Sequence, residues 1–378
     1  MTRPIRFIIV GLGHIGRRHA ALVAAHPEAE VVAVVDPLPR EQLNWPEPLS
    51  DDVAKFNQLA GALLYTQADV ACICTPNGLH AQQAIVCMEA GLDVVIEKPI
   101  ATTKTDAQAI ATVAERTGKR VFGVMQNRYS PASAWLKHSL EQRALGEVLQ
   151  VHLNCFWNRD HRYYTLLNSA PAASPLAGRN KISVATSPAG VSRNEFPPPL
   201  TAPHPWHGHS SLDAGVLYTQ FAHFIDLLCW AFGEPAIDYA RFANQTHQGT
   251  HDFPDTGTVQ FTLPGGAIGC LNFSTAIWDQ NFESTLTVIG TEGTIKLGGQ
   301  YMNEVRYCHA KKLDFPDLPP SAPGNNYGGY TGSAANHHFV IDNVVDVLRG
   351  RAEIATPIAE GEVVVRTIEN IYKAGGEA

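Results

Sequence analysis

The sequence predicts an α/β protein: an N-terminal doubly wound Rossmann domain, then an α/β domain with a large open, mainly antiparallel sheet. Three observations predict it. Apolar strands alternate with helical segments over the first third of the chain, as a parallel sheet requires. A glycine turn, Gly11-x-Gly13-x-x-Gly16, directly follows the first strand. Beyond about residue 128, strands of alternating polarity are joined by short turns, which is typical of an antiparallel sheet.

Length and composition agree with two domains. The chain has 378 residues, of which 45% are hydrophobic and 17% charged, and this is too long for one ordinary core. We place the domains at 1–127 and 128–378. No apolar run reaches the roughly 18 residues of a membrane span, and the first strand runs straight into glycines, unlike a signal peptide. A net charge of -8 argues against nucleic acid or a membrane as partner.

The cysteines and histidines show no metal-binding pattern. The seven cysteines are odd in number and irregularly spaced, which indicates a reduced, cytoplasmic chain. Cys72 and Cys74 alternate along an apolar strand and are expected to pack. His204, His207 and His209 lack a helical metal spacing. We therefore expect no metal site.

The first block has the features of a dinucleotide-binding unit. After the strand at 5–10, Gly11 makes the tight turn, Gly13 lets backbone approach the pyrophosphate, and Gly16 lets helix pack on strand. The pyrophosphate then lies at the helix N-terminus, where the N–H groups are free. His14 and Ile15 belong to this turn and are counted among the cofactor-binding residues.

Asp36 ends the second strand and indicates which dinucleotide is bound. Its carboxylate can accept hydrogen bonds from the adenosine ribose hydroxyls. It would repel a 2′-phosphate, and only Arg40 stands nearby to offset that repulsion. The sequence therefore favours NAD, with NADP less favoured.

Three further strands end in polar residues. Ligands of doubly wound sheets bind beyond the carboxyl ends of the strands, so these residues are expected to meet there. The three groups are Thr75-Pro76-Asn77, Glu97-Lys98-Pro99 and Gln126-Asn127-Arg128. Lys98 is expected to point at the ligand, with Pro99 fixing the turn that directs it.

The motifs G-x-G-x-x-G, T-P-N-x-x-H and E-K-P, in this order, resemble the Gfo/Idh/MocA family of NAD(P)-dependent sugar and polyol dehydrogenases. The resemblance covers nearly the whole chain and implies the two-domain fold stated above. It places Thr75, Pro76, Asn77, His80, Glu97 and Lys98 at the cofactor, with Gln126 and Arg128 at the nicotinamide end. We expect Glu97 to orient backbone or the nicotinamide.

The second domain is read as one helix, several strands and two closing helices. We expect a helix at 130–146 and a strand at 147–160. Further strands are expected at 236–246, 256–275 (a hairpin through 264–266) and 283–299. The closing helices are expected at 334–349 and 358–374, and the apolar stretch 211–233 is expected to be one more helix.

His223 lies in the stretch 211–233, three residues before Asp226. A lone histidine on an apolar helix is more often a core group than a catalyst. The family motif G-G-x-x-x-D-x-x-x-H-x-x-D reverses that preference and places the histidine next to the reacting hydroxyl. Here the usual first aspartate is Thr219, which argues against an aspartate–histidine relay and a free polyol substrate.

Several segments, among them QNRYSPA and WNRDHRYYT, are similar to the sugar-nucleotide 3-dehydrogenases of bacterial surface polysaccharide pathways. Those enzymes oxidise the 3-hydroxyl of UDP-N-acetylglucosaminuronate. Arg159, Arg162, Tyr163 and Tyr164, on a strand end, would suit such a substrate: guanidinium groups grip phosphate or carboxylate, and tyrosine stacks on uracil. A solvated strand end with core tyrosines is the alternative. The insertion at about 165–205 is read as a surface loop, either a lid or a subunit contact.

The sequence therefore predicts hydride transfer between a sugar hydroxyl carbon and NAD, on a nucleotide sugar, in a cytoplasmic homodimer or homotetramer. Lys98 and His223 share the tasks of base and alkoxide stabiliser, with the pKa of Lys98 lowered by a dry site. Which of them is the base stays open. Rival hypotheses are a family dehydrogenase acting on a free sugar or inositol, and a non-catalytic NAD sensor. The sensor hypothesis expects Lys98 or His223 to be lost, and both are present.

Overall fold

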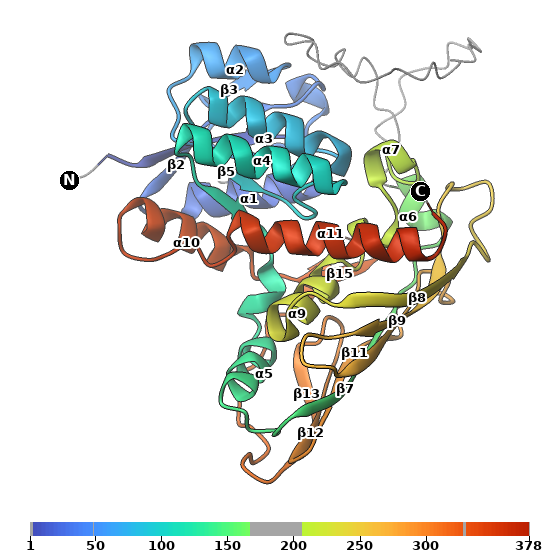
Figure 1. The fold of residues 1–378 in the computed structure, drawn as a ribbon. Helices are drawn as coiled ribbons and strands as arrows, with labels where there is room; N and C mark the ends of the chain where they lie inside the picture. The colour runs from blue at the N-terminus through green and yellow to red at the C-terminus, as the bar shows by residue number, and fades with distance from the viewer. Residues whose placement is uncertain (1–2, 48, 167–205, 328–329, 378) are drawn as a thin grey trace.

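The computed structural model describes residues 3–47, 49–166, 206–327 and 330–377 (Figure 1). Apart from its first two residues, the predicted insertion at 165–205 lies outside these ranges. No helix among the described residues is long and apolar enough to cross a membrane.

The N-terminal sheet is parallel throughout, as expected from the alternation of strands and helices. Its strand order is β3-β2-β1-β4-β5-β6. The strands are β1 (Ile5–Val10), β2 (Ala29–Val35), β3 (Ala54–Phe56), β4 (Val70–Ile73), β5 (Asp93–Ile96) and β6 (Val121–Gly123). The order reverses at β1, and a ligand site is expected beyond the strand ends there.

Helices cover both faces of this sheet. Since successive residues of β1 point to opposite faces, its side chains pack against both layers of helices. Phe7 and Ile9 pack with α10 (His337–Leu348) in one apolar cluster, and α1 (His14–Ala25) lies on the same face. Ile8 and Val10 belong to a second cluster, which includes apolar residues of α3 (His80–Glu89) and α4 (Lys104–Thr117). Helix α10, from the C-terminal part of the chain, therefore covers one face of the first sheet. Helix α2 (Leu59–Tyr65) lies near β2 and β3.

The second sheet has the order β13-β12-β11-β7-β10-β9-β8. Neighbours are antiparallel except β7 and β10, which run parallel. The strands are β7 (Val148–Phe156), β8 (Ala236–Ala243), β9 (Thr256–Thr262), β10 (Ile268–Ser274), β11 (Glu283–Gly290), β12 (Gly293–Gly298) and β13 (Glu304–Ala310). A separate hairpin joins β14 (Gly324–Asn326) and β15 (Thr331–Ala334).

One face of the second sheet is covered, which confirms the expectation from its alternation. Leu153 and Leu286 pair across β7 and β11 and are buried with apolar residues of α9 (Ala222–Phe232) and α11 (Ile358–Ala374). The neighbouring pair Asn154 and Thr285 faces the other way. Helix α5 (Pro131–Glu141) leads into β7, and α11 runs between α4 and the second sheet (Figure 1).

The expectation of one helix at 211–233 is wrong. The stretch forms three short helices: α7 (Ser210–Asp213), α8 (Val216–Thr219) and α9. Ala214 and Gly215 have φ angles of 66° and 103°, which no α-helix permits. A side chain at Gly215 would place Cβ 2.6 Å from the hydroxyl of Tyr372, so the chain turns at a residue without one.

The placement of Arg162, Tyr163 and Tyr164 on a strand end is also wrong. Strand β7 stops at Phe156, and these residues lie on a short helix, α6 (His161–Leu166). The Asp160 carboxylate accepts a hydrogen bond from the backbone N–H of Arg162 at 2.9 Å, and so satisfies a free donor of the first turn.

Candidate active site

The glycine turn after β1 has the geometry that a dinucleotide site requires. Gly11 has φ 87°, and a Cβ there would lie 2.8 Å from the carbonyl oxygen of Cys74. A Cβ on Gly16 would lie 1.8 Å from the carbonyl oxygen of Gly11, so only glycine lets α1 start so close to the turn. At Gly13 a Cβ would meet no heavy atom within 4 Å. The turn therefore leaves open space beside exposed backbone at the N-terminus of α1, which fits a pyrophosphate.

Asp36 holds this turn in place. Its Oδ2 accepts a hydrogen bond from the N–H of Leu12 at 2.8 Å, and its Oδ1 accepts one from the N–H of Leu38 at 2.9 Å. Arg40, the residue that could have neutralised a 2′-phosphate, instead pairs with Asp51 at 2.5 Å and lies over the ring of Trp45. This arrangement fits NAD, with its free ribose hydroxyls.

His80 and Asn77 of the T-P-N-x-x-H motif contact other parts of the protein. The two ring nitrogens of His80 each lie 2.7 Å from a carbonyl oxygen, one of Thr75 and one of Pro99. This histidine therefore ties the end of β4 to the end of β5. Asn77 Nδ2 donates to the carbonyl oxygen of Asp213 at 2.8 Å and to Thr219 Oγ at 2.9 Å. Contact of these residues with NAD stays a prediction.

Glu97 is buried between two histidines and fixes the backbone of Lys98. Its Oε1 lies 2.8 Å from Nε2 of His19 and 3.6 Å from Nε2 of His337, and the second distance is too long for a hydrogen bond. Burial raises the pKa of Glu97, but the hydrogen bond with His19 and the neighbouring imidazoles hold that pKa well below its usual range. Oε2 accepts a hydrogen bond from the N–H of Lys98 at 3.1 Å. Glu97 thus orients the backbone of Lys98.

Lys98 lies two residues beyond the end of β5, and a cis peptide bond joins it to Pro99. Its side chain reaches the second domain. Its Nζ donates to the carbonyl oxygen of Thr219 at 2.6 Å. Burial lowers the pKa of Lys98, the carboxylates of Glu97 and Asp213 raise it, and the charge of Arg159 lowers it. The net direction is downward, as the sequence predicted, so the amine is easier to deprotonate than a surface lysine.

His223 is the second residue of α9 and lies in its first turn. It is 2% exposed, and its Nε2 lies 3.1 Å from Nε2 of Gln126. Burial and the positive charge of Lys98 lower the pKa of His223 well below its usual value, so the imidazole is neutral. The structure thus brings together four predicted residues from both domains: Lys98, Gln126, Thr219 and His223.

Arg128 is not among them, although it was predicted at the nicotinamide end. Its guanidinium is 6% exposed and grips the carboxylate of Asp226 in bidentate fashion, with N–O distances of 2.8 and 2.5 Å. It also contacts Glu360. The final aspartate of the histidine motif therefore holds Arg128, and this pair ties α9 to the segment that follows β6.

The predicted substrate arginines have different surroundings. Arg159 is 1% exposed, lies over the rings of Trp157 and Tyr330, and donates to Gln220 Oε1 at 2.6 Å. Among the described residues no carboxylate pairs with it. Arg162 is half-exposed and pairs with two carboxylates, those of Asp160 and Asp279.

The two predicted tyrosines are buried, each 5% exposed, and their rings meet edge to face. Tyr163 accepts a hydrogen bond from Gln220 Nε2 at 2.7 Å. Arg159 and Tyr163 therefore both reach the residue that follows Thr219, whereas Arg162 is committed to its ion pairs. Substrate binding by these side chains stays a prediction.

One residue of this site was missed by sequence reasoning. Asp213 is 2% exposed, and its carboxylate contacts the hydroxyl of Thr219. The local sequence signal, an aspartate followed by Ala214-Gly215, was hidden because the stretch was read as one helix. Only the break between α7 and α8 brings Asp213 back against Thr219.

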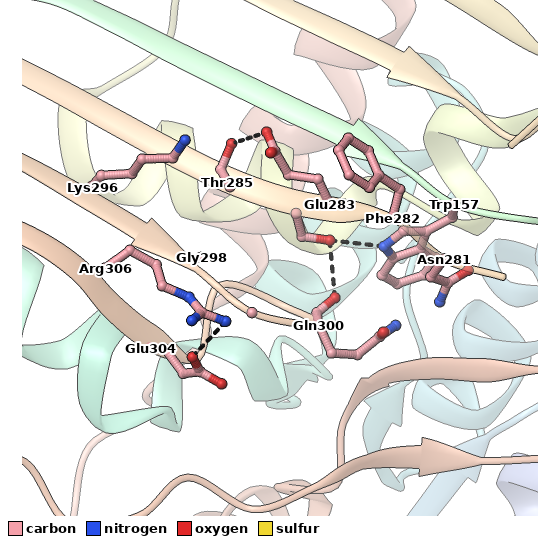
Figure 2. Close-up of a pocket in the computed structure, with 12 residues that line it drawn as sticks. Trp157, Asn281, Phe282, Glu283, Thr285, Lys296, Gly298, Gln300, Glu304 and Arg306 are labelled. Atoms are coloured by element: carbon pink, nitrogen blue, oxygen red, sulfur yellow. Dashed lines mark hydrogen bonds and ion pairs between the residues drawn. The ribbon is translucent and has the colours of Figure 1, made fainter.

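A separate cavity of about 540 Å³ lies on the second sheet (Figure 2). It is lined by residues of β11, β12 and β13, including Lys296 and Arg306. Two of its charged groups form an ion pair, Arg306 with Glu304 at 2.8 Å, and Glu283 accepts a hydrogen bond from the hydroxyl of Thr285 at 2.6 Å. None of the predicted site residues lines it, so we assign the active site to the strand ends of the first sheet.

Comparison with known proteins identifies the family of the chain. Residues 5–124 match the model of the GFO_IDH_MocA oxidoreductase family with an NAD-binding Rossmann fold, and residues 189–296 match a GFO/IDH/MocA C-terminal domain. The WlbA dehydrogenase of Bordetella pertussis, solved with NADH and UDP-GlcNAcA, superposes with a TM-score of 0.78 at 27% identity; the alignment covers 99% of this chain and 97% of that one.

Curated relatives match over a shorter stretch. D-glucoside 3-dehydrogenase of Escherichia coli K12 is 27% identical over 151 residues, 39% of this chain and 42% of its own length. Inositol 2-dehydrogenase of Salmonella typhimurium LT2 is 28% identical over 146 residues, 38% of this chain and 44% of its own. The chain thus aligns with less than half the length of these two relatives. The family models, the fold and the glycine turn together show that the chain belongs to the Gfo/Idh/MocA family of oxidoreductases, with an NAD-binding Rossmann domain.

Proposed function

We propose that this protein is an NAD-dependent dehydrogenase that oxidises a hydroxyl carbon of a sugar. The proposed substrate is a UDP-linked N-acetylglucosaminuronate-type sugar, and the proposed position is its 3-hydroxyl. The observation that carries the proposal is the hydrogen bond from Lys98, beyond the carboxyl end of β5, to the carbonyl oxygen of Thr219 in the second domain, just before the helix that carries His223.

The nucleotide sugar is favoured because the proposed site combines residues of both domains, so a likeness that spans both domains carries more weight than one limited to the first. The WlbA likeness spans 99% of the chain, while the curated sugar and inositol relatives align over 38–39% of it. Arg159 supports the same choice. Its buried guanidinium lies in an aromatic setting with no described carboxylate partner, so an anionic group of the substrate would stabilise it.

We assign the base to Lys98. Its side chain is partly exposed, whereas His223 is 2% exposed, so Lys98 is the group that a substrate hydroxyl can reach in this structure. Burial lowers the pKa of Lys98, so a fraction of the lysine is a neutral amine that can take a proton. The bond to the Thr219 carbonyl fixes Nζ in one place. Bound NAD supplies the hydride acceptor.

His223 acts beside Lys98 as a neutral imidazole. Gln126 contacts its Nε2, which restricts the orientation of the ring. Because the pKa of His223 is far below its usual value, the imidazole does not compete with Lys98 for the proton at neutral pH. Its proposed task is to polarise the reacting oxygen.

A substrate panel tests this proposal. UDP-N-acetylglucosaminuronate, N-acetylglucosamine and myo-inositol are each incubated with the protein and NAD, and reduced nicotinamide is followed by absorbance. We expect reduction with the nucleotide sugar alone. Turnover of inositol without turnover of the nucleotide sugar would reject the proposed substrate in favour of the free-sugar activity of the curated relatives.

A further inference from the structure

Asp213 is a buried carboxylate beside the proposed catalytic pair. It ends α7, and its Oδ2 accepts a hydrogen bond from the N–H of Gly208 at 2.8 Å and lies 3.7 Å from Nδ1 of His207. Among the described residues, no lysine or arginine forms an ion pair with it. A buried carboxylate is costly without a compensating positive group. The nearby cation that its charge affects is Lys98.

The hydrogen bonds have a defined direction. The carbonyl oxygen of Asp213 can only accept, so the Asn77 atom 2.8 Å from it is the amide nitrogen. The same nitrogen donates to Thr219 Oγ at 2.9 Å, so the Thr219 hydroxyl has its own hydrogen left to give. Two oxygens of Asp213 lie within reach of that hydrogen: carboxylate Oδ1, which contacts Thr219 Oγ, and the backbone carbonyl oxygen at 2.9 Å. Oδ1 is the closer and the negatively charged acceptor, so we direct the hydrogen to it. The carbonyl oxygen of the same threonine accepts from Lys98 Nζ at 2.6 Å.

We propose that Asp213 is a positioning residue for the reaction: its carboxylate fixes Thr219, the backbone partner of Lys98, and supplies negative charge to the lysine. In the family motif an aspartate occupies the position of Thr219 itself. Here the carboxylate comes from a residue six positions earlier and acts through the threonine. This inference rests on the proposed function, because it assumes that Lys98 takes part in the chemistry.

The charges around Lys98 set the expected pH response. Glu97 on its own segment and Asp213 on α7 raise its pKa, while burial and Arg159 lower it. His223 on α9 is neutral. Removing the charge of Asp213 must therefore lower the pKa of Lys98 further. The amine should then deprotonate at lower pH, and the acid limb of the rate profile should move with it.

The test measures the titration of Lys98 directly, so it does not depend on the identity of the substrate. The full-length protein is labelled briefly with acetic anhydride over a range of pH, and modification of the Lys98 peptide is quantified by mass spectrometry. Asp213→Asn should move the labelling midpoint to lower pH. Asp252→Asn is the matched control, since Asp252 is an exposed carboxylate that contacts the other end of α7. It should leave the midpoint in place.

A variant that moves the carboxylate tests whether Asp213 acts on Lys98 through Thr219. In Asp213→Asn/Thr219→Asp the carboxylate returns to the position that the family motif uses, and the midpoint should move back up. Thr219→Val breaks the link without changing net charge and serves if Asp213→Asn does not fold. It should lower kcat about tenfold or more, because Lys98 loses its fixed position, and leave KM for NAD unchanged.

Two outcomes overturn the inference: an unchanged Lys98 midpoint in Asp213→Asn, or an equal shift in Asp252→Asn. Failure of the proposed function looks different. It would appear as full activity of Lys98→Met, or as no activity on the nucleotide sugar, whatever the labelling shows.

Discussion

Replacing Lys98 by methionine separates its chemistry from its structural contribution. The methionine keeps most of the bulk of the stem and removes the amine. Among the residues that the structure describes, Nζ makes one hydrogen bond, to the Thr219 carbonyl, so its loss should change the free energy of unfolding by only about 1 kcal/mol. Loss of a positioned acid–base group should lower the rate about a hundredfold or more, which corresponds to about 2.7 kcal/mol of barrier. The chemical effect therefore exceeds the structural one.

The assay is single-turnover reduction of NAD by UDP-N-acetylglucosaminuronate, with melting curves and NAD titration as folding controls. Lys311→Met is the matched control, because Lys311 is an exposed lysine paired with Glu292 on the second sheet. His223→Asn should reduce the rate as much as Lys98→Met, and the double variant should be little worse than either, since groups that act as one unit are not additive. If Lys98→Met turns over within about threefold of the wild type, the assignment of the base is wrong.

Three further results are expected. NADP should bind at least tenfold more weakly than NAD in fluorescence titration, a difference of about 1.4 kcal/mol, because the Asp36 carboxylate lies at the glycine turn, where we expect the ribose, and Arg40 is paired elsewhere. Equal affinities would contradict this. Arg128→Leu should lower the free energy of unfolding by about 3–5 kcal/mol, because it leaves Asp226 buried and unpaired, and Arg128→Leu/Asp226→Leu should recover part of the loss in denaturant titrations. Acid should destabilise the fold, because burial lowers the pKa of His337 from 6.5 to about 4. Between these two pH values the unfolded chain binds a proton at His337 that the folded chain does not. The free energy of unfolding therefore falls as the pH drops through this window. His337→Gln should flatten this fall in melting temperature, and an unchanged slope would show that other groups cause it.

Local patterns in the sequence predicted the parts of the fold that neighbouring residues determine. The glycine turn predicted the start of the first domain because each glycine meets a local steric demand, and the structure shows those demands at Gly11 and Gly16. The closing helices were placed within three residues at each end, since their apolar periodicity is strong. Lys98 was expected at a strand end, where the alternation of strands and helices puts it.

What the sequence did not predict depends on contacts between distant segments. The break at Ala214 and Gly215 makes room for Tyr372, which is far along the chain, so the apolar run alone predicts a continuous helix. Helix α10 was assigned to the second domain by its position, yet its apolar face packs on the first sheet. The ion pair of Arg128 with Asp226 joins residues 98 positions apart, so no local pattern predicted it; contact of Arg128 with the nicotinamide stays a prediction.

The parts of the site that come from the first and the second domain depend on each other. Asn77 stands in a motif that the resemblance assigns to the cofactor, yet its amide nitrogen donates to two groups of the second domain, the Asp213 carbonyl and the Thr219 hydroxyl. The neighbouring Gly78 permits this approach, because a Cβ there would lie 2.3 Å from the carbonyl oxygen of Ser211. The segment that ends β4 therefore anchors α7 and α8, and it also holds the residues that the resemblance assigns to the cofactor. Since Lys98 is bonded to Thr219 across the same junction, the position of the proposed base depends on the docking of the two domains, which no local sequence pattern specifies.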